Sequence, residues 1–367
     1  MDMKLLLLVI AMVLFGLIMV YSSSFIYAQE KTGNGFFLIS KQIVYACLGF
    51  CALSAAIRVD YRLWGKWAYG ILGLAILLLA LILIPGVGEK VGGARRWIHL
   101  AGLRFQPGEF AKFAVLFFVA RQLERKQEKI NQFAAGLLSN FIVPLPAMIL
   151  LLIQPDFGTT VMITCVVFIL LFIGGVPWRY LFGAVVLAGL VGVWLAFGTA
   201  YRRARLMGFM DPWTDPGGKG FQILQSLIGL HHGRLWGVGL GNGKEKLFYL
   251  PEAHNDFIFS VIGEELGFIG IAAVVFAYLY LIYRGLRIAW NCQKGQQDHF
   301  GMLLAAGITL ALGLQGFVNM AVVLGLVPTK GLTLPFISYG GSALVVDLFA
   351  VGVLLSIGRG TRASGKQ

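Results

Sequence analysis

The residues best suited to chemistry in this sequence surround Asp256, where a long polar segment gives way to a strongly apolar run. Ionisable groups at the mouth of a membrane helix are energetically unfavourable and usually serve a function. A carboxylate there, shielded by apolar neighbours yet reached by water, can act as a general base for a hydroxyl nucleophile, with His254 and partial burial tuning its pKa. The alternative is an N-cap, in which Asn255 or Asp256 accepts backbone N–H bonds as the helix begins. Position alone leaves both interpretations open.

Two further groups of charged residues fall inside or between apolar runs. Glu109 and Lys112 share a helix face and can pair, and inside a membrane span such pairing is nearly obligatory. The pair is either a structural ion pair or the polar floor of a substrate cavity. Asp156 follows Pro155 in a tight turn between two apolar runs, which by itself indicates a turn or cap residue.

The segment 329–342 forms a polar entry, broken by proline and glycine, to the last apolar run. Non-helical backbone at membrane depth is tolerated where it lines a cavity. A simple linker has no need of Lys330, Ser338 and Tyr339 together, so a cavity is favoured. Asp347 lies inside the last run, where a buried, hydrogen-bonded role is favoured over a catalytic one.

The elements that must position these groups are membrane helices. Of the 367 residues 58% are hydrophobic and 13% are charged, whereas a soluble domain carries about 25% charged residues. Apolar runs near the ~20 residues needed to cross a bilayer recur along the whole chain. We therefore expect an all-α integral membrane protein, a polytopic bundle of about ten transmembrane helices forming a single domain over 1–367. The spans are expected at about 5–24, 37–57, 68–84, 107–121, 135–153, 158–175, 180–198, 256–283, 301–325 and 343–358.

Charge predicts the orientation of these helices. The net charge is +13, and one set of short connections is rich in Lys and Arg, which the positive-inside rule places in the cytoplasm together with both termini. The basic residues flank apolar spans, so nucleic acid is not the expected partner. On the outer side, the connection that holds Arg95 and Arg96 breaks the rule. Basic residues retained there are suited to an anionic ligand.

The connection 199–255, between helices 7 and 8, is the longest and is expected to be a large extracytoplasmic loop. Long loops without structure are uncommon unless they are functional. The apolar stretches 221–230 and 247–250 predict short helices on the outer membrane surface. The loop glycines at 237–243 lack a following Walker lysine–hydroxyl pair, so nucleotide binding is rejected.

Eight motifs occur along the chain: GARRWI (93–98), QPGEFAK (106–112), QPDFG (154–158), DPWTDP (211–216), GLGN (239–242), LPEAH (250–254), PTKGLTLP (328–335) and SYGGS (338–342). Together they make the chain resemble the SEDS family (shape, elongation, division and sporulation), and within it the division and sporulation branches more than the elongation branch. The resemblance runs essentially from end to end. Asn255, Gly108, Ala343 and Asp347 depart from the usual family pattern.

The resemblance implies a peptidoglycan glycosyltransferase of the bacterial cytoplasmic membrane, with its active site on the outer face. Such an enzyme polymerises lipid II by inverting transfer, with Asp256 as the base. It works beside a class B penicillin-binding protein, with other division or elongation proteins and membrane lipids as further partners. A cofactor is not demanded, and a divalent cation, Mg²⁺ or Mn²⁺, is left open. The implied substrate contacts are Arg95, Arg96, Glu109, Lys112, Asp156, Arg203, His254, Lys330 and Ser338.

Two other functions compete with the polymerase. A transporter that flips a lipid-linked precursor would use a charged pair inside the membrane and broken helices equally well. Two observations argue against a transporter. The large loop and Asp256 are both expected on the outer side of the membrane, and no inverted repeat is evident in the sequence. A scaffold that only recruits partners would not need Asp256 at all.

Overall fold

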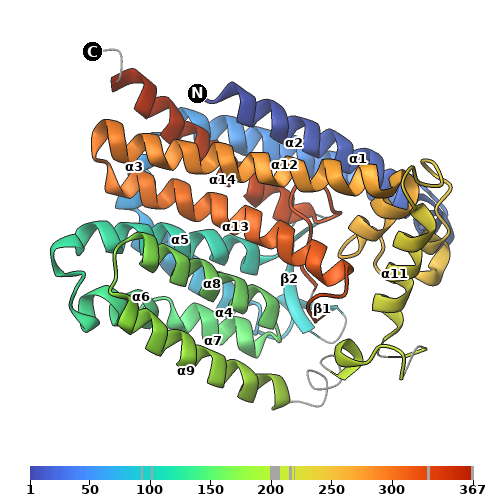
Figure 1. The fold of residues 1–367 in the computed structure, drawn as a ribbon, viewed down its shortest axis with the longest axis horizontal. Coiled ribbons are helices and arrows are strands. Elements are labelled where there is room, and N and C mark those ends of the chain that lie inside the picture. Colours follow the sequence, from blue (N-terminus) through green and yellow to red (C-terminus); the bar gives the residue numbers. More distant parts are fainter. Residues whose placement is uncertain are drawn as a thin grey trace.

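The computed structural model of the protein is a bundle of long helices that run roughly along the longest axis of the molecule (Figure 1). The structure describes residues 1–91, 94–100, 102–198, 207–214, 217–218, 220–328 and 331–364. α1 begins and α14 ends at the same end of the bundle, whereas β1, β2 and α11 lie at the other end (Figure 1). Chain segments far apart in sequence therefore meet at two opposite ends.

Among the residues that the structure describes, seven helical segments are long and apolar enough to cross a membrane. The helix α5, Pro107–Arg125, occupies the place of the fourth predicted span, and each of the other predicted spans also coincides with helix in the described residues. The multi-pass helical architecture is thus confirmed. The seven long segments are α1 (Met3–Thr32), α2 (Phe37–Arg58), α9 (Trp178–Phe197), α12 (Ile258–Gln296), α13 (His299–Val323), α14 (Gly341–Ser364) and one composite run, which consists of η2 (Ala134–Leu138), α6 (Ser139–Ile142) and α7 (Leu145–Ile153). The shorter helices are α3 (Tyr61–Lys66), α4 (Ala68–Leu81), η1 (Gln127–Lys129), α8 (Phe157–Ile173), α11 (Phe221–Gly233) and η3 (Glu245–Tyr249).

A small antiparallel sheet departs from the all-α expectation. Its strands β1 (Gly88–Val91), β2 (Ala94–Leu100) and β3 (Leu103–Phe105) are ordered β1-β2-β3. Glu89 ties the strands together because its carboxylate reaches His99 Nε2 at 2.7 Å and Arg104 Nη2 at 2.8 Å. Such short, charged strands carry too weak an alternation to be distinguished from a loop in the sequence.

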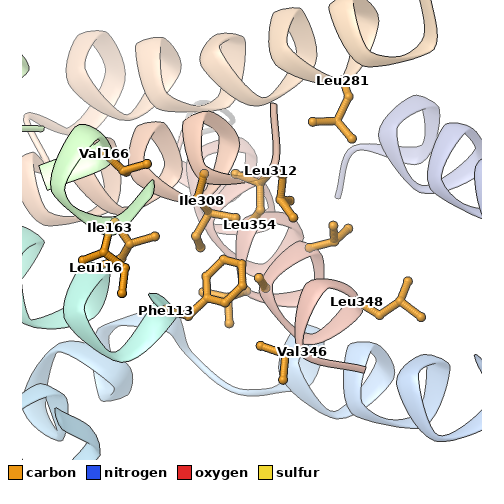
Figure 2. Packing of buried hydrophobic residues seen from close by; sticks show 14 of the residues in the cluster. Phe113, Leu116, Ile163, Val166, Leu281, Ile308, Leu312, Val346, Leu348 and Leu354 are labelled. Atoms are coloured by element: carbon orange, nitrogen blue, oxygen red, sulfur yellow. The ribbon is translucent and has the colours of Figure 1, made fainter. Parts of the chain in front are cut away.

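The core of the bundle is built around α13 and α14, which are the most buried of the seven spans, while α9 is the least buried. Figure 2 shows the packing, with Leu116 of α5 lying beside Ile163 of α8, and Phe113 of α5 lying on the side of Ile308 of α13. In a membrane, helices associate through close packing, which small residues permit. A Cβ on Gly352 would lie 2.6 Å from the carbonyl oxygen of Leu53, so glycine lets α14 approach α2 closely.

The long helix α12 is broken at Gly267, where φ is 64° and ψ is −162°. This backbone conformation is essentially restricted to glycine. The N–H and C=O groups that the break frees are paired with the segment 234–239, so this part of the long connection before α12 is hydrogen-bonded to the helix. The bonds are Val238 N to Glu264 O (3.0 Å), Gly239 N to Glu265 O (3.0 Å), Phe268 N to Arg234 O (2.9 Å) and Ile269 N to Leu235 O (3.3 Å).

Replacing Gly267 with alanine is therefore expected to destabilise the protein by roughly 2–4 kcal/mol, from backbone strain and overpacking. The added Cβ would meet Gly237 N at 2.4 Å and Leu235 O at 2.6 Å. Thermal unfolding in detergent measures the effect. Gly189→Ala in α9 is the matched control, because no atom lies within 4 Å of its added Cβ, and it should unfold at or above the wild-type temperature. Equal melting of the two variants would contradict the described break.

Candidate active site

Asp256 lies at one end of the bundle, immediately before α12. The N-cap position of that helix belongs to Phe257, with no side-chain cap bond, so the alternative interpretation of Asn255 or Asp256 as the N-cap is wrong. The Asn255 side chain instead donates to the Glu252 carboxylate. Asp256 is partly exposed, and its carbonyl oxygen accepts a hydrogen bond of 2.8 Å from Asn319 Nδ2. The chain therefore fixes the Asp256 backbone through a contact from α13.

Two amides on α13 hold the segment 331–334 against Asp256. Asn319 Nδ2 also donates to the Leu332 carbonyl at 2.6 Å. One helical turn earlier, Gln315 Nε2 donates to the Thr333 carbonyl at 3.1 Å. A Cβ on Gly331 would lie 3.0 Å from Asp256 Oδ2, so the carboxylate faces this segment directly. Arg203 and Lys330, two expected substrate contacts, lie outside the described residues.

A charged cluster is buried beneath this segment. Lys112 Nζ lies 2.8 Å from Glu109 Oε2 and 3.5 Å from Asp347 Oδ1, and the three residues are at most 6% exposed. Lys112 also donates to Gln315 Oε1 at 2.5 Å. The expected pairing of Glu109 with Lys112 is thus present in the structure. Asp347 is the third member of the cluster, and Gln315 links the cluster to the segment that faces Asp256.

The loop that carries His254 contacts the loop that carries Ser338 and Tyr339. The His254 carbonyl accepts from Tyr339 N at 3.0 Å, and its ring lies between Tyr27 (centroids 5.1 Å apart) and Tyr339 (5.7 Å). Burial lowers the pKa of His254, so its imidazole is uncharged at neutral pH. The buried Ser338 hydroxyl accepts from Leu334 N at 2.8 Å. Both side chains therefore help to shape the loops around Asp256.

The small sheet brings Arg96 onto the turn that precedes α8. Its guanidinium donates to the carbonyls of Gln154, at 3.2 Å, and Pro155, while Arg95 is exposed. Asp156 is the N-cap residue of α8 and accepts from Thr159 N at 3.3 Å. Gly108 at the start of α5 lies close by, because its added Cβ would be 3.3 Å from Asp156 Oδ2. Arg96 and Asp156 thus form a second polar group beside the N-terminus of α5.

A third buried group docks the loop 207–255 on the bundle. Glu265 accepts from Lys246 Nζ at 2.6 Å and from Ser22 Oγ at 2.7 Å. Glu264 accepts from Lys244 N at 2.7 Å. Burial, with the nearby Glu264 carboxylate, raises the pKa of Glu245 to about 7. These contacts give Glu264 and Glu265 a structural role that the sequence did not reveal.

Gln315 and Asn319 are the site residues that sequence reasoning missed. They are one helical turn apart on the same face of an otherwise apolar span, and this spacing is the signal that could have found them. Lys246, by contrast, gave no signal, because its partners Ser22 and Glu265 come from distant parts of the chain. Only the folded chain shows that contact.

The donor set around Asp256 does not fit a resident divalent cation. Within the described ranges, no group of three or more His, Cys, Asp or Glu side chains is placed to hold a metal ion. Mg²⁺ and Mn²⁺ favour several oxygen ligands, and the nearby Glu109 carboxylate faces Lys112.

The fold and this site define a multi-pass membrane protein in which an accessible carboxylate lies above a buried ion cluster. A family model, cell cycle proteins of the FtsW/RodA/SpoVE type, matches residues 3–363. The chain belongs to this family, the SEDS peptidoglycan glycosyltransferases. It is therefore an enzyme of the cell-division and sporulation class and a multi-pass membrane protein.

Individual relatives cover nearly the whole chain. A probable peptidoglycan glycosyltransferase FtsW from Geobacter sulfurreducens is 46% identical over 364 residues, which are 99% of this chain and 96% of the relative. Stage V sporulation protein E from Bacillus subtilis is 40% identical over 363 residues, 98% of each chain.

Solved structures show the same fold. A chain of a peptidoglycan synthase complex, described as coordinating polymerization and crosslinking, gives a TM-score of 0.79 at 33% identity over 98% of both chains. The rod shape determining protein RodA from Thermus thermophilus gives 0.69 at 28% identity, over 98% of this chain and 96% of RodA. The architecture therefore extends from end to end in both.

Proposed function

We propose that this enzyme polymerises lipid II into glycan strands and that Asp256 is the general base. The observation that carries the proposal is the placement of its carboxylate, partly exposed and facing Gly331, on a backbone held by Asn319. A fixed and accessible carboxylate is what proton abstraction requires. Residues 1–367 act as one domain with both termini in the cytoplasm, so this site and the 199–255 loop face outward.

In the proposed reaction, Asp256 removes the proton from the 4-hydroxyl of the acceptor N-acetylglucosamine. The resulting oxygen attacks C1 of the donor N-acetylmuramic acid, and the bond from C1 to undecaprenyl pyrophosphate breaks. The α-linked donor yields a β-1,4 bond, so one base and no covalent intermediate are needed. The leaving group departs as an anion, which favours cationic stabilisation. The proposed contributors are exposed Arg95, together with Arg203 and Lys330.

The buried cluster supports the same site from below. Lys112 is tied to Glu109 and Asp347, and through Gln315 it reaches Thr333 in the segment that faces Asp256. Its proposed role is to keep that segment in place while the polar substrate binds, with His254 and Ser338 shaping the adjoining loops. Arg96 and Asp156 position the edge of the site. A class B penicillin-binding protein is the proposed partner that crosslinks the product.

The decisive experiment supplies purified protein with lipid II, with and without a class B penicillin-binding protein, and resolves the glycan products by gel electrophoresis. Long strands are expected, and adding the partner tests whether polymerisation depends on it. A parallel assay measures flipping of fluorescent lipid II in liposomes. Robust flipping without polymer in either condition would overturn the proposal in favour of transport.

A further inference from the structure

A cavity of about 230 Å³ lies beside the start of α1, and none of its lining residues belongs to the candidate active site. Its charged lining residues are Asp2, Lys4, Arg284 and Arg287, together with the polar Asn291. Three cations thus surround the cavity against one carboxylate. Two helices distant in sequence, α1 and α12, supply these charges.

One of the three cations is already paired and gives the cavity its shape. Asp2 Oδ2 accepts from Arg284 Nε at 3.1 Å and from Nη2 at 2.5 Å. Asp2 Oδ1 also accepts from Leu5 N at 3.1 Å, which caps α1. This buried pair joins the start of α1 to α12, so the wall of the cavity is a built part of the fold rather than a chance surface hollow.

The other two cations are available to a ligand. Lys4 and Arg287 are exposed, and in the described part of the chain neither has an ion-pair partner. The positive-inside rule accounts for basic residues at helix ends. It does not account for their convergence from two helices on one cavity.

The chain neighbours of the lining residues are typical of a membrane interface. Tyr283 and Trp290 on α12 and Met3 on α1 are exposed, and Lys294 Nζ lies 5.0 Å from the centroid of the Trp290 ring. Tyr and Trp concentrate at the level of lipid headgroups. A ligand here would therefore meet cations in the cavity and apolar surface beside it, which matches an amphiphile better than a free ion.

From these observations we propose that this cavity binds the phosphate of an anionic phospholipid headgroup. Lys4 and Arg287 pair with the phosphate, Asn291 offers an amide donor, and the acyl chains extend along the exposed apolar residues of α1 and α12. Arg284 holds Asp2 and so preserves the cavity. The proposal does not depend on the reaction at Asp256.

The test uses the full-length protein in nanodiscs of phosphatidylcholine, with dioleoyl phosphatidylglycerol or inorganic phosphate added, and native mass spectrometry of retained lipid. The test variant is Lys4→Gln/Arg287→Gln. The matched control, Arg125→Gln/Lys129→Gln, removes the same charge from exposed residues of the α5–η1 region that do not line the cavity. Melting in phosphatidylcholine alone reports whether both variants fold.

The wild-type protein and the control variant are expected to retain phosphatidylglycerol. The test variant should bind this lipid roughly tenfold more weakly, because each interfacial basic residue contributes appreciably to the affinity for anionic lipid. Equal retention by the test variant would overturn the proposal, as would an equal loss in the control. If inorganic phosphate alone gives the same rise in melting temperature as phosphatidylglycerol, the ligand is free phosphate and the lipid assignment is wrong.

Discussion

Replacing Asp256 with asparagine is expected to lower the rate of glycan polymerisation by about 10²–10⁴-fold, the usual contribution of a general base. Asparagine keeps the shape of the side chain but cannot accept the hydroxyl proton. The fold should persist, because the bond from Asn319 is made to the Asp256 main-chain oxygen. Turnover of lipid II by the purified variant, with its melting temperature as the check on folding, measures the effect.

Glu252→Gln is the matched control for this substitution. Glu252 is an exposed carboxylate in the same loop, and it accepts only a local contact from Asn255 among its described neighbours. Its variant should keep nearly full activity. If the Asp256→Asn variant polymerises as fast as the Glu252→Gln variant, Asp256 is not the base. If the Asp256→Asn variant loses binding of lipid II rather than turnover, the role of Asp256 is in recognition.

The membrane helices could be predicted from sequence because their signal is local. An apolar run of sufficient length is visible without knowing what packs against it, and even α5, with Glu109 and Lys112 inside it, was placed correctly. The short helix α11 (Phe221–Gly233) likewise followed from the apolar stretch 221–230. Helix ends were less well placed, because α12 continues to Gln296, well past the expected end near 283.

Features that depend on distant contacts could not be predicted. The break at Gly267 is one glycine among 48 in the sequence, and what distinguishes it is the pairing of its freed backbone groups with 234–239. The sheet that carries Arg95 and Arg96 is stabilised by Glu89 contacts to His99 and Arg104. Neither of these tertiary contacts is marked by a periodic pattern in the sequence.

The contacts of the candidate site likewise divide into those that the sequence predicts and those that depend on distant parts of the chain. The pairing of Glu109 with Lys112 follows from helical spacing, which fixes which side chains can meet. The contact of Asp347 with Lys112 depends on how α14 packs against α5. The link from Lys112 through Gln315 to Thr333 depends on the position of α13. Of the two interpretations that the sequence leaves open, the N-cap alternative for Asn255 or Asp256 is wrong for a local reason, since the helix begins at Ile258 with Phe257 as its N-cap.

The substitution with the largest expected effect on stability is Lys112→Met. It would leave the buried carboxylates of Glu109 and Asp347 without the ammonium that lies 2.8 and 3.5 Å from them. Removing one partner of a buried ion pair costs about 3–5 kcal/mol because a charge is left uncompensated. Asp347→Asn is the matched control: it keeps the side-chain shape and the Glu109–Lys112 contact, and it leaves one cation facing one anion. Thermal unfolding in detergent should show a large drop for the first variant and little change for the second.

A triple variant separates the two roles of Lys112. Replacing Glu109 and Lys112 with methionine and Asp347 with leucine turns the cluster apolar, and such replacements are often neutral or stabilising. The melting temperature should therefore recover, but polymerisation should not, because the bond from Lys112 to Gln315 and its support of Thr333 are gone. Recovery of both properties would show that the cluster serves stability alone. Wild-type melting of Lys112→Met would contradict the buried ion cluster itself.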